Sequence, residues 1–239
     1  MRRDRTGCTR HRSRESTMTD ALFEDAPRPA RALGPGAFWL PGWLTLEQQA
    51  WIVDRFHEWR AGPVPIRSAT VRGHEMSVQT VCLGWHWRPY QYSRDAVDVN
   101  GNQVLAFPDW MLRLGRRAIV EATGDSRSGD TYTPDTALVN LYDDDARMGM
   151  HQDKDEATLE PVVSLSIGDS ATFRFGNSEN RNRPYEDIEL RSGDLFVFGG
   201  PSRLAFHGIT KVQPRTAPTG CGLREGRINI TMRVTGLTD

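Results

Sequence analysis

The sequence has few cysteines and no long apolar run. Its three cysteines, Cys8, Cys82 and Cys221, lie far apart in 239 residues and form no CxxC pair. A disulfide framework is therefore excluded, and a reducing cytoplasm is the simplest setting. No apolar run approaches the roughly 20 residues that span a bilayer, so we expect no membrane partner. The apolar stretch typical of a secretory signal is also missing.

An excess of charge of one sign is lacking as well, since the formal net charge is −1. Residues 1–17 hold six arginines against two acids, a formal +4, which leaves a formal −5 on the rest of the chain. An acidic body is a poor general binder of polyanions, so any nucleic acid has to be bound through a local patch. We expect residues 1–20 to form a basic, disordered extension, although a nucleic-acid-binding arm is an alternative. Residues 21–239 are then a single domain.

Two helices are predicted in the first half of the chain. Residues 44–60 ("LTLEQQAWIVDRFHEWR") begin with a capping box of Thr45 and Gln48. Their expected apolar face consists of Leu46, Ala50, Val53 and Phe56. The second helix covers residues 108–124, with Pro108 at its start and Gly124 just past its end.

From about residue 136 the pattern changes to short apolar runs between turn residues. The runs are "ALVNLY", "VVSLSIG", "ATFRF", "DIEL", "DLFVFGG" and "INITMRV". Gly, Pro, Asn and Asp separate them, as in a β-sandwich or jelly roll. The fold class is therefore α+β, with helices before a β-rich half.

"GMHQDKDEAT" (149–158) carries several groups that bind metals. In an extended segment, positions i and i+2 point the same way, so His151 and Asp153 converge. An imidazole and a carboxylate are two members of the 2-His-1-carboxylate triad of non-haem Fe(II). His207 lies in "PSRLAFHGIT", the segment directly after "DLFVFGG", 54 residues past Asp153, and could be the third ligand. The His-x-Asp pair taken alone is more often a charged surface turn.

The strand "RINITMRV" (227–234) has an unusual polar face. Alternation puts Arg227, Asn229, Thr231 and Arg233 on one side. This face carries two arginines and no acid, whereas a solvated face usually mixes charges. Guanidinium groups form paired hydrogen bonds to carboxylates, so the face suits a small dicarboxylate such as 2-oxoglutarate. Asn140 and Tyr142 share a face of "ALVNLY" and could bind the same ligand.

Taken together, these motifs resemble the AlkB family of Fe(II)- and 2-oxoglutarate-dependent nucleic-acid demethylases. The resemblance rests on "HQDKDE" (151–156), "FHG" (206–208) and the closing "RxNxTxR" (227–233), and it covers residues 21–236. It implies a double-stranded β-helix (jelly roll) core with N-terminal helices and a nucleotide-recognition lid at about residues 72–100. Fe(II), 2-oxoglutarate as cosubstrate and O2 are the implied cofactors.

The resemblance also implies roles for individual residues. The implied iron ligands are His151, Asp153 and His207. The implied 2-oxoglutarate ligands are Asn140, Tyr142, Arg227, Asn229, Thr231 and Arg233. The implied substrate contacts are Trp85, Tyr90, Tyr92, Asp155, Arg181 and Arg147. Among these, Asp155 corresponds to an acid that contacts the exocyclic amine of the damaged base. The lid departs from the family pattern, because it is shorter and carries an added Trp87.

The implied reaction is oxidative demethylation of 1-methyladenine and 3-methylcytosine in single-stranded DNA, with RNA left open. It releases formaldehyde, succinate and CO2. A methyl group on the Watson–Crick edge weakens base pairing, so extruding such a base from the helix costs less free energy. Trp85 and Tyr90 offer stacking surface, although a packed aromatic cluster is the alternative. We expect a monomer.

Two other functions remain open at this point. One is a 2-oxoglutarate oxygenase that acts on a small molecule or a protein side chain. The other is a cupin-like binding module without activity. The presence of all three ligand types and both arginines argues against the second alternative.

Overall fold

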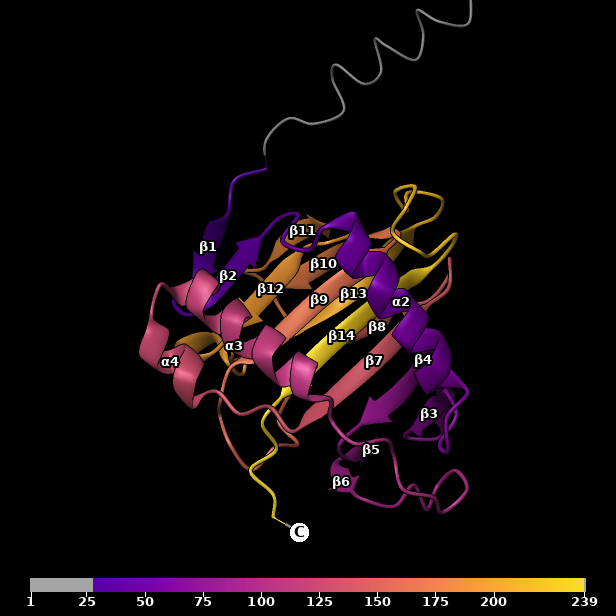
Figure 1. Ribbon diagram of the computed structural model, residues 1–239. Helices are drawn as coiled ribbons and strands as arrows, with labels where there is room; N and C mark the ends of the chain where they lie inside the picture. Colours follow the sequence, from indigo (N-terminus) through magenta and orange to yellow (C-terminus); the bar gives the residue numbers. More distant parts are fainter. Residues whose placement is uncertain (1–27, 239) are drawn as a thin grey trace, which may run out of the picture.

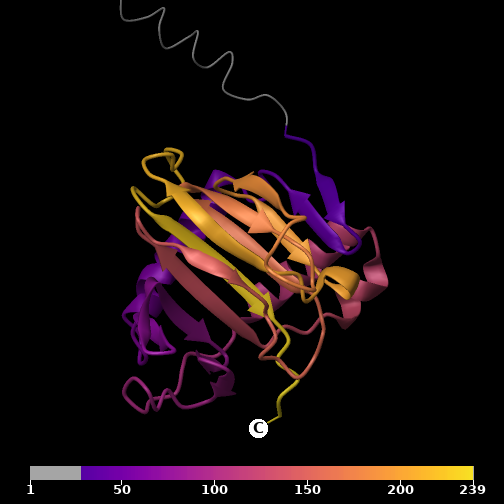
Figure 2. The ribbon, with the colours of Figure 1, turned by 180° about the vertical axis from the view of Figure 1, so that it is seen from behind.

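The structure is a computed structural model that describes residues 28–238. The predicted extension at residues 1–20 lies outside the described residues. Two antiparallel sheets face each other, and helices cover the outer face of the larger sheet (Figures 1 and 2). This arrangement is consistent with the predicted jelly-roll core. None of the described helices is long and apolar enough to cross a membrane.

The larger sheet has eight strands. Their spatial order is β1 (Arg31–Gly34), β2 (Ala37–Leu40), β12 (Leu195–Phe198), β9 (Val162–Gly168), β14 (Arg227–Arg233), β7 (Thr136–Tyr142), β4 (His74–Leu83) and β3 (Arg67–Val71). The smaller sheet has the order β11 (Glu186–Leu190), β10 (Ser170–Phe175), β13 (His207–Gln213) and β8 (Met148–His151). Each predicted run of the second half forms one of these strands.

Three α-helices are described: α2 (Leu46–Arg60), α3 (Asp109–Thr123) and α4 (Ser126–Thr131), together with the short 3-10 helix η1 (Gly200–Ser202). The capping box is present, because Thr45 Oγ1 accepts from the Gln48 amide while Gln48 Oε1 accepts from the Thr45 amide. Gly124 ends α3 in the left-handed conformation, with a φ of 72°. Leu46, expected on the buried face of α2, is 45% exposed, so that part of the prediction is wrong.

The core is divided by the larger sheet. On the outer face, Ile228, Ile230 and Met232 of β14 pack with residues of α2 and α3. On the inner face, Phe173 and Phe196 belong to a second apolar cluster that joins the two sheets. Because side chains alternate along β14, its polar residues point between the sheets. The polar face of β14 is therefore not a face exposed to water, because the whole strand is buried.

A separate hairpin of β5 (His86–Arg88) and β6 (Gln91–Ser93) lies beside the larger sheet (Figure 1). Within it, Trp87 pairs directly with Tyr92. The predicted lid at about residues 72–100 includes this hairpin and the β3–β4 turn. It also includes β4, which is paired to β7 and therefore belongs to the main sheet.

Candidate active site

Three side chains converge where β8 and β13 lie side by side. His151 and His207 are direct partners in this strand pair, and Asp153 follows β8 by two residues. Nε2 of His151 lies 3.5 Å from Asp153 Oδ1, and Nε2 of His207 lies 3.7 Å from Asp153 Oδ2. One ligand atom from each residue lies within 4.8 Å of the other two. The predicted triad is therefore assembled in space.

The protonation of these side chains suits a divalent metal. Nδ1 of His151 and of His207 hydrogen-bonds to a backbone carbonyl, that of Gly149 at 3.0 Å and that of Ala205 at 2.9 Å. These bonds place the proton on Nδ1 and leave the Nε2 lone pair toward Asp153. Burial lowers the pKa of His207 to about 4, so its imidazole is neutral near pH 7.

The carboxylate of Asp153 is held ionised. Burial is the largest single influence and would raise its pKa, but the Arg233 guanidinium 2.8 Å away, together with His207 and His151, outweighs burial and holds the pKa well below its usual range. Two imidazoles and one carboxylate are the donor set of the non-haem Fe(II) triad, so these residues fit Fe(II).

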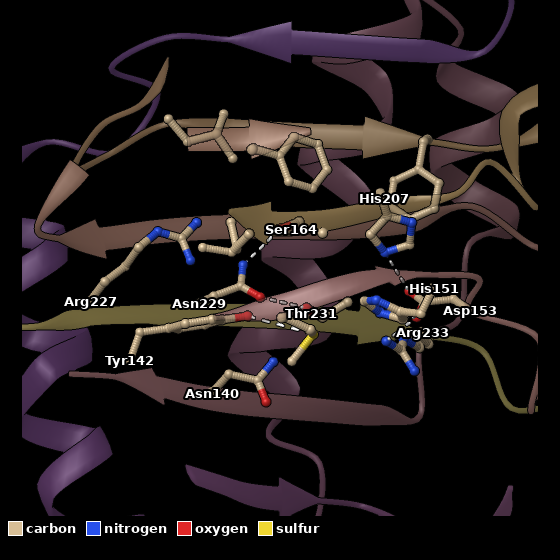
Figure 3. A pocket seen from close by; sticks show the side chains of 16 residues that line it. Asn140, Tyr142, His151, Asp153, Ser164, His207, Arg227, Asn229, Thr231 and Arg233 are labelled. Atoms are coloured by element: carbon tan, nitrogen blue, oxygen red, sulfur yellow. Dashed lines mark hydrogen bonds and ion pairs between the residues drawn. The ribbon is translucent and has the colours of Figure 1, made fainter. Parts of the chain in front are cut away.

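A narrow cavity of about 40 Å³ extends from the triad between the two sheets. Figure 3 shows the triad at one end and Arg227 at the other. The side chains lining it include Asn140, Tyr142, Ser164, Asn229, Thr231 and Arg233. All six residues predicted to bind 2-oxoglutarate therefore line one cavity with the triad.

Arg227 has the properties of a carboxylate receptor. It is 1% exposed, and its Nη2 donates to Ser166 Oγ over 2.8 Å. Its Nε and Nη1 are buried without a hydrogen-bond partner. Leaving buried donors unsatisfied costs about 1–3 kcal/mol, more for charged groups, so the arrangement favours an anionic ligand. Burial also raises the pKa of Tyr142 to about 12, so its hydroxyl remains a donor.

Two serines of β9, which were not predicted from the sequence, hold these side chains. Ser166 accepts from Arg227, and Ser164 Oγ accepts from Asn229 Nδ2 over 2.8 Å. Their signal was present as the alternating serines of "VVSLSIG", which place both hydroxyls on one strand face.

A second, wider cavity of about 440 Å³ lies on the other side of the triad. The residues lining both cavities are Asn140, Met148, His151, Asp153 and Arg233. His151 and Asp153 therefore stand where a narrow inner cavity meets a wide outer one, while His207 lines the inner cavity.

Four residues of the outer wall are Trp87, Tyr90, Asp155 and Arg181. Trp87 Nε1 donates to Asp155 Oδ2 over 2.9 Å, which holds the indole against the wall. Tyr90 is 60% exposed, and its hydroxyl accepts from Arg72 Nε over 3.3 Å. Three of the predicted substrate contacts, Tyr90, Asp155 and Arg181, therefore lie on this wall.

The other three predicted substrate contacts do not line the outer cavity. Trp85 is 6% exposed in the bend between β4 and β5, where its Nε1 donates to Asp135 and Arg94 stacks on its ring. Tyr92 is 7% exposed and hydrogen-bonds to Glu156. Arg147 is exposed to solvent and lies outside the lining. Trp87, rather than the predicted Trp85, lines the outer cavity.

Next to Asp153 lies a buried charge cluster that was not predicted from the sequence. Arg203 donates to the Asp153 carbonyl and to Glu156. Glu156 also accepts from Arg233. Glu156 was visible in "HQDKDE", three residues past Asp153, but nothing in the sequence pointed to Arg203.

Comparisons with known proteins agree with this geometry. The family model described as the 2OG-Fe(II) oxygenase superfamily matches residues 36–233. "Alpha-ketoglutarate-dependent dioxygenase AlkB" of Salmonella typhimurium is 34% identical over 223 residues, which cover 90% of this chain and 97% of that protein. "DNA N(6)-methyladenine demethylase ALKBH1D" of Arabidopsis thaliana is 33% identical over 223 residues, which cover 85% of this chain. The chain spans about half the length of this plant relative, 50%.

Among solved structures, OsALKBH1 superposes with a TM-score of 0.76 and 32% sequence identity. The match covers 85% of this chain and 100% of that one. The family model spans both strands that carry the histidines and the polar face of β14. With its triad, its cosubstrate cavity and relatives matched along most of its length, the chain belongs to the 2OG-Fe(II) oxygenase superfamily and, within it, to the AlkB family.

Proposed function

We propose that this protein removes N-linked methyl groups from bases of single-stranded DNA, using Fe(II), O2 and 2-oxoglutarate. The observation that carries the proposal is the meeting of two cavities at the His151–Asp153–His207 triad. The inner cavity suits a small dicarboxylate, and the outer one is wide enough for a base. The relatives named above include a DNA demethylase and a dioxygenase.

The inner cavity binds and orients the cosubstrate. The unpartnered nitrogens of Arg227 receive the carboxylate far from the triad, and the Tyr142 hydroxyl donates beside it. Arg233 lies at the other end and keeps Asp153 ionised and oriented. Fe(II) with 2-oxoglutarate and O2 supplies the oxidation of the methyl C–H bond, and the hydroxylated methyl group leaves as formaldehyde while succinate and CO2 form.

The outer cavity receives the extruded base. The ring of Trp87 offers a stacking face, and Tyr90 offers a second aromatic surface at the rim. Asp155 Oδ2 is occupied by Trp87, which leaves Oδ1 to accept from an exocyclic amine. Lys154 and Arg181 also line this cavity and supply cations for backbone phosphates.

Two turns form the nucleotide-recognition lid in this proposal. One joins β3 to β4 and carries Arg72, and the other joins β5 to β6 and carries Tyr90. The bond from Arg72 Nε to the Tyr90 hydroxyl links them at the outer cavity.

The test is mass spectrometry of methylated oligonucleotides after incubation with protein, Fe(II), 2-oxoglutarate and ascorbate. We expect loss of one methyl group from single-stranded DNA that carries 1-methyladenine or 3-methylcytosine. Asp153→Ala should abolish the loss, whereas the exposed His57→Ala on α2 should retain it. The same assay with RNA that carries these lesions tests whether RNA is also a substrate. Unchanged oligonucleotides together with normal succinate release would overturn the proposed substrate.

A second candidate substrate is N6-methyladenine in DNA. The name of the Arabidopsis relative favours it. The same assay with an N6-methyladenine oligonucleotide compares the lesions directly, because each product differs from its substrate by one methyl group.

A further inference from the structure

Glu156 joins three elements in the protein interior. Its side chain is 0% exposed, and both carboxylate oxygens are used. Oε1 accepts from the Tyr92 hydroxyl over 2.6 Å and from Arg233 Nη1 over 3.0 Å, while Oε2 accepts from Arg203 Nη2 over 2.9 Å. The Tyr92 hydroxyl also accepts from Arg233 Nη1, over 3.1 Å. Tyr92, Glu156 and Arg233 therefore form a closed triangle of hydrogen bonds.

The triangle has one corner in the hairpin and one at the metal centre. Tyr92 belongs to β6, and its direct cross-strand partner is Trp87 of the outer cavity wall. Cross-strand partners present their side chains on the same face. This face of the hairpin bonds to two consecutive residues of the loop after β8. Trp87 donates to Asp155, and Tyr92 donates to Glu156. Arg233, the third corner, contacts Asp153 through Nη2 at 2.8 Å.

The charges in this cluster balance. Asp153 and Glu156 are two buried acids, and Arg203 and Arg233 are two buried bases. Removing the Glu156 charge leaves two guanidinium groups beside one carboxylate. Arg233 then loses one of the two carboxylates that hold it, and the Tyr92 hydroxyl loses its carboxylate acceptor while keeping its bond to Arg233. Removing one partner of a buried ion pair destabilises a protein far more than removing one partner of a surface ion pair.

We propose that Glu156 is a positioning residue that couples the β5–β6 hairpin to the cosubstrate cavity. Through the Tyr92–Glu156–Arg233 triangle, 2-oxoglutarate beside Arg233 stabilises the hairpin position that presents Trp87 to a base. Nucleic acid and 2-oxoglutarate therefore bind cooperatively. This inference rests on the proposed function, because it takes the outer cavity as the site of the base.

The test measures the coupling itself. Mn(II) replaces Fe(II) to prevent turnover, and the affinity for a fluorescent single-stranded oligonucleotide with 1-methyladenine is measured with and without saturating 2-oxoglutarate. Wild-type protein should bind at least about 5-fold more tightly with 2-oxoglutarate, the lower end for coupled sites. In Glu156→Gln and in Tyr92→Phe the ratio of the two affinities should approach one. Glu160→Gln, an exposed carboxylate in the same loop, should keep the wild-type ratio.

Tyr92→Phe keeps the inference testable if Glu156→Gln fails to fold. It deletes one hydroxyl and retains the bond between Glu156 and Arg233, so 2-oxoglutarate binding without oligonucleotide should be unchanged. A merely structural role lowers the melting temperature and leaves the affinity ratio intact, because both affinities come from the same folded protein. A wild-type ratio in Tyr92→Phe, or no coupling in the wild type, would overturn the inference alone. Failure to bind any methylated oligonucleotide would overturn the proposed function and the inference together.

Discussion

Trp87 donates its indole N–H to the carboxylate of Asp155 over 2.9 Å, and this bond connects the hairpin to the wall of the outer cavity. Asp155 lies two residues past the metal ligand Asp153. An aromatic face is thereby held near the metal centre, where an extruded base would have to stack. Trp85, two residues earlier, bonds instead to Asp135 and is buried away from that cavity. The two tryptophans therefore have separable roles.

Trp87→Ala should weaken binding of a methylated oligonucleotide by about 1–3 kcal/mol, as loss of base stacking does. Metal and 2-oxoglutarate affinities should be unaffected, because Trp87 is absent from the inner cavity. Trp85→Ala is the matched comparison and should cost about 3–5 kcal/mol of stability, as a core truncation does. Fluorescence anisotropy and thermal unfolding on both variants separate the roles. Weak binding in a stable Trp85→Ala protein would contradict this assignment.

Arg227→Lys should weaken 2-oxoglutarate binding by about 1.5–3 kcal/mol, the range for hydrogen bonds to charged groups. Lysine keeps the charge but loses the planar, paired donors of a guanidinium. In Arg227 two of these donors, Nε and Nη1, are buried without a hydrogen-bond partner. Calorimetric titration of the Mn(II)-loaded protein measures the change. Arg191→Lys, at an exposed arginine that pairs with Glu189, is the control and should bind normally. An unchanged affinity in Arg227→Lys would place the far carboxylate elsewhere.

Metal should stabilise the wild type but not the His207→Ala variant. A metal that binds the folded state at about 100 times its dissociation constant adds about 2.7 kcal/mol to the free energy of unfolding. Without His207 only two of the three ligands remain, so most of this gain should disappear. Denaturant unfolding with and without Mn(II) measures it, and His57→Ala serves as the control. If Mn(II) stabilised His207→Ala as much as the wild type, His207 would not be a metal ligand.

The stability of the protein should fall as the pH drops below about 6.5, partly because of His86. Burial lowers the pKa of this 1%-exposed side chain, despite its hydrogen bond to Asp98. In the unfolded chain its pKa is about 6.5, so on acidification the unfolded state takes up the proton first. The contribution of His86 is therefore present above the unfolded pKa and is lost as the pH falls toward the folded one.

His86→Gln stays neutral throughout and should show a shallower decrease in unfolding free energy between about pH 8 and pH 5. Denaturant unfolding at each pH, on the wild type and the variant in parallel, makes the comparison. The difference between the two curves isolates His86 from other histidines. Parallel curves would show that His86 takes up its proton equally in both states.

Local rules were enough for the elements whose signals lie within a few residues. The capping box of α2 formed as expected because its two hydrogen bonds join residues three apart. Leu46 was wrongly expected on the buried face, since helical spacing alone does not say which face a sheet will cover. The two faces of β14 could be predicted, because alternation sends Arg227 and Ile228 to opposite faces whichever strands pair with it.

The sequence by itself determined the donor set of the metal centre and the polar face of the cosubstrate cavity. Both depend on residue chemistry and on the period of a strand, which are local properties. Only the tertiary structure decided that Trp87 rather than Trp85 reaches the outer cavity. It also decided that the Tyr92 hydroxyl donates to Glu156, 64 residues away in the chain. These outcomes depend on which distant groups satisfy a buried indole or hydroxyl, and that choice is made when the hairpin packs against the loop after β8.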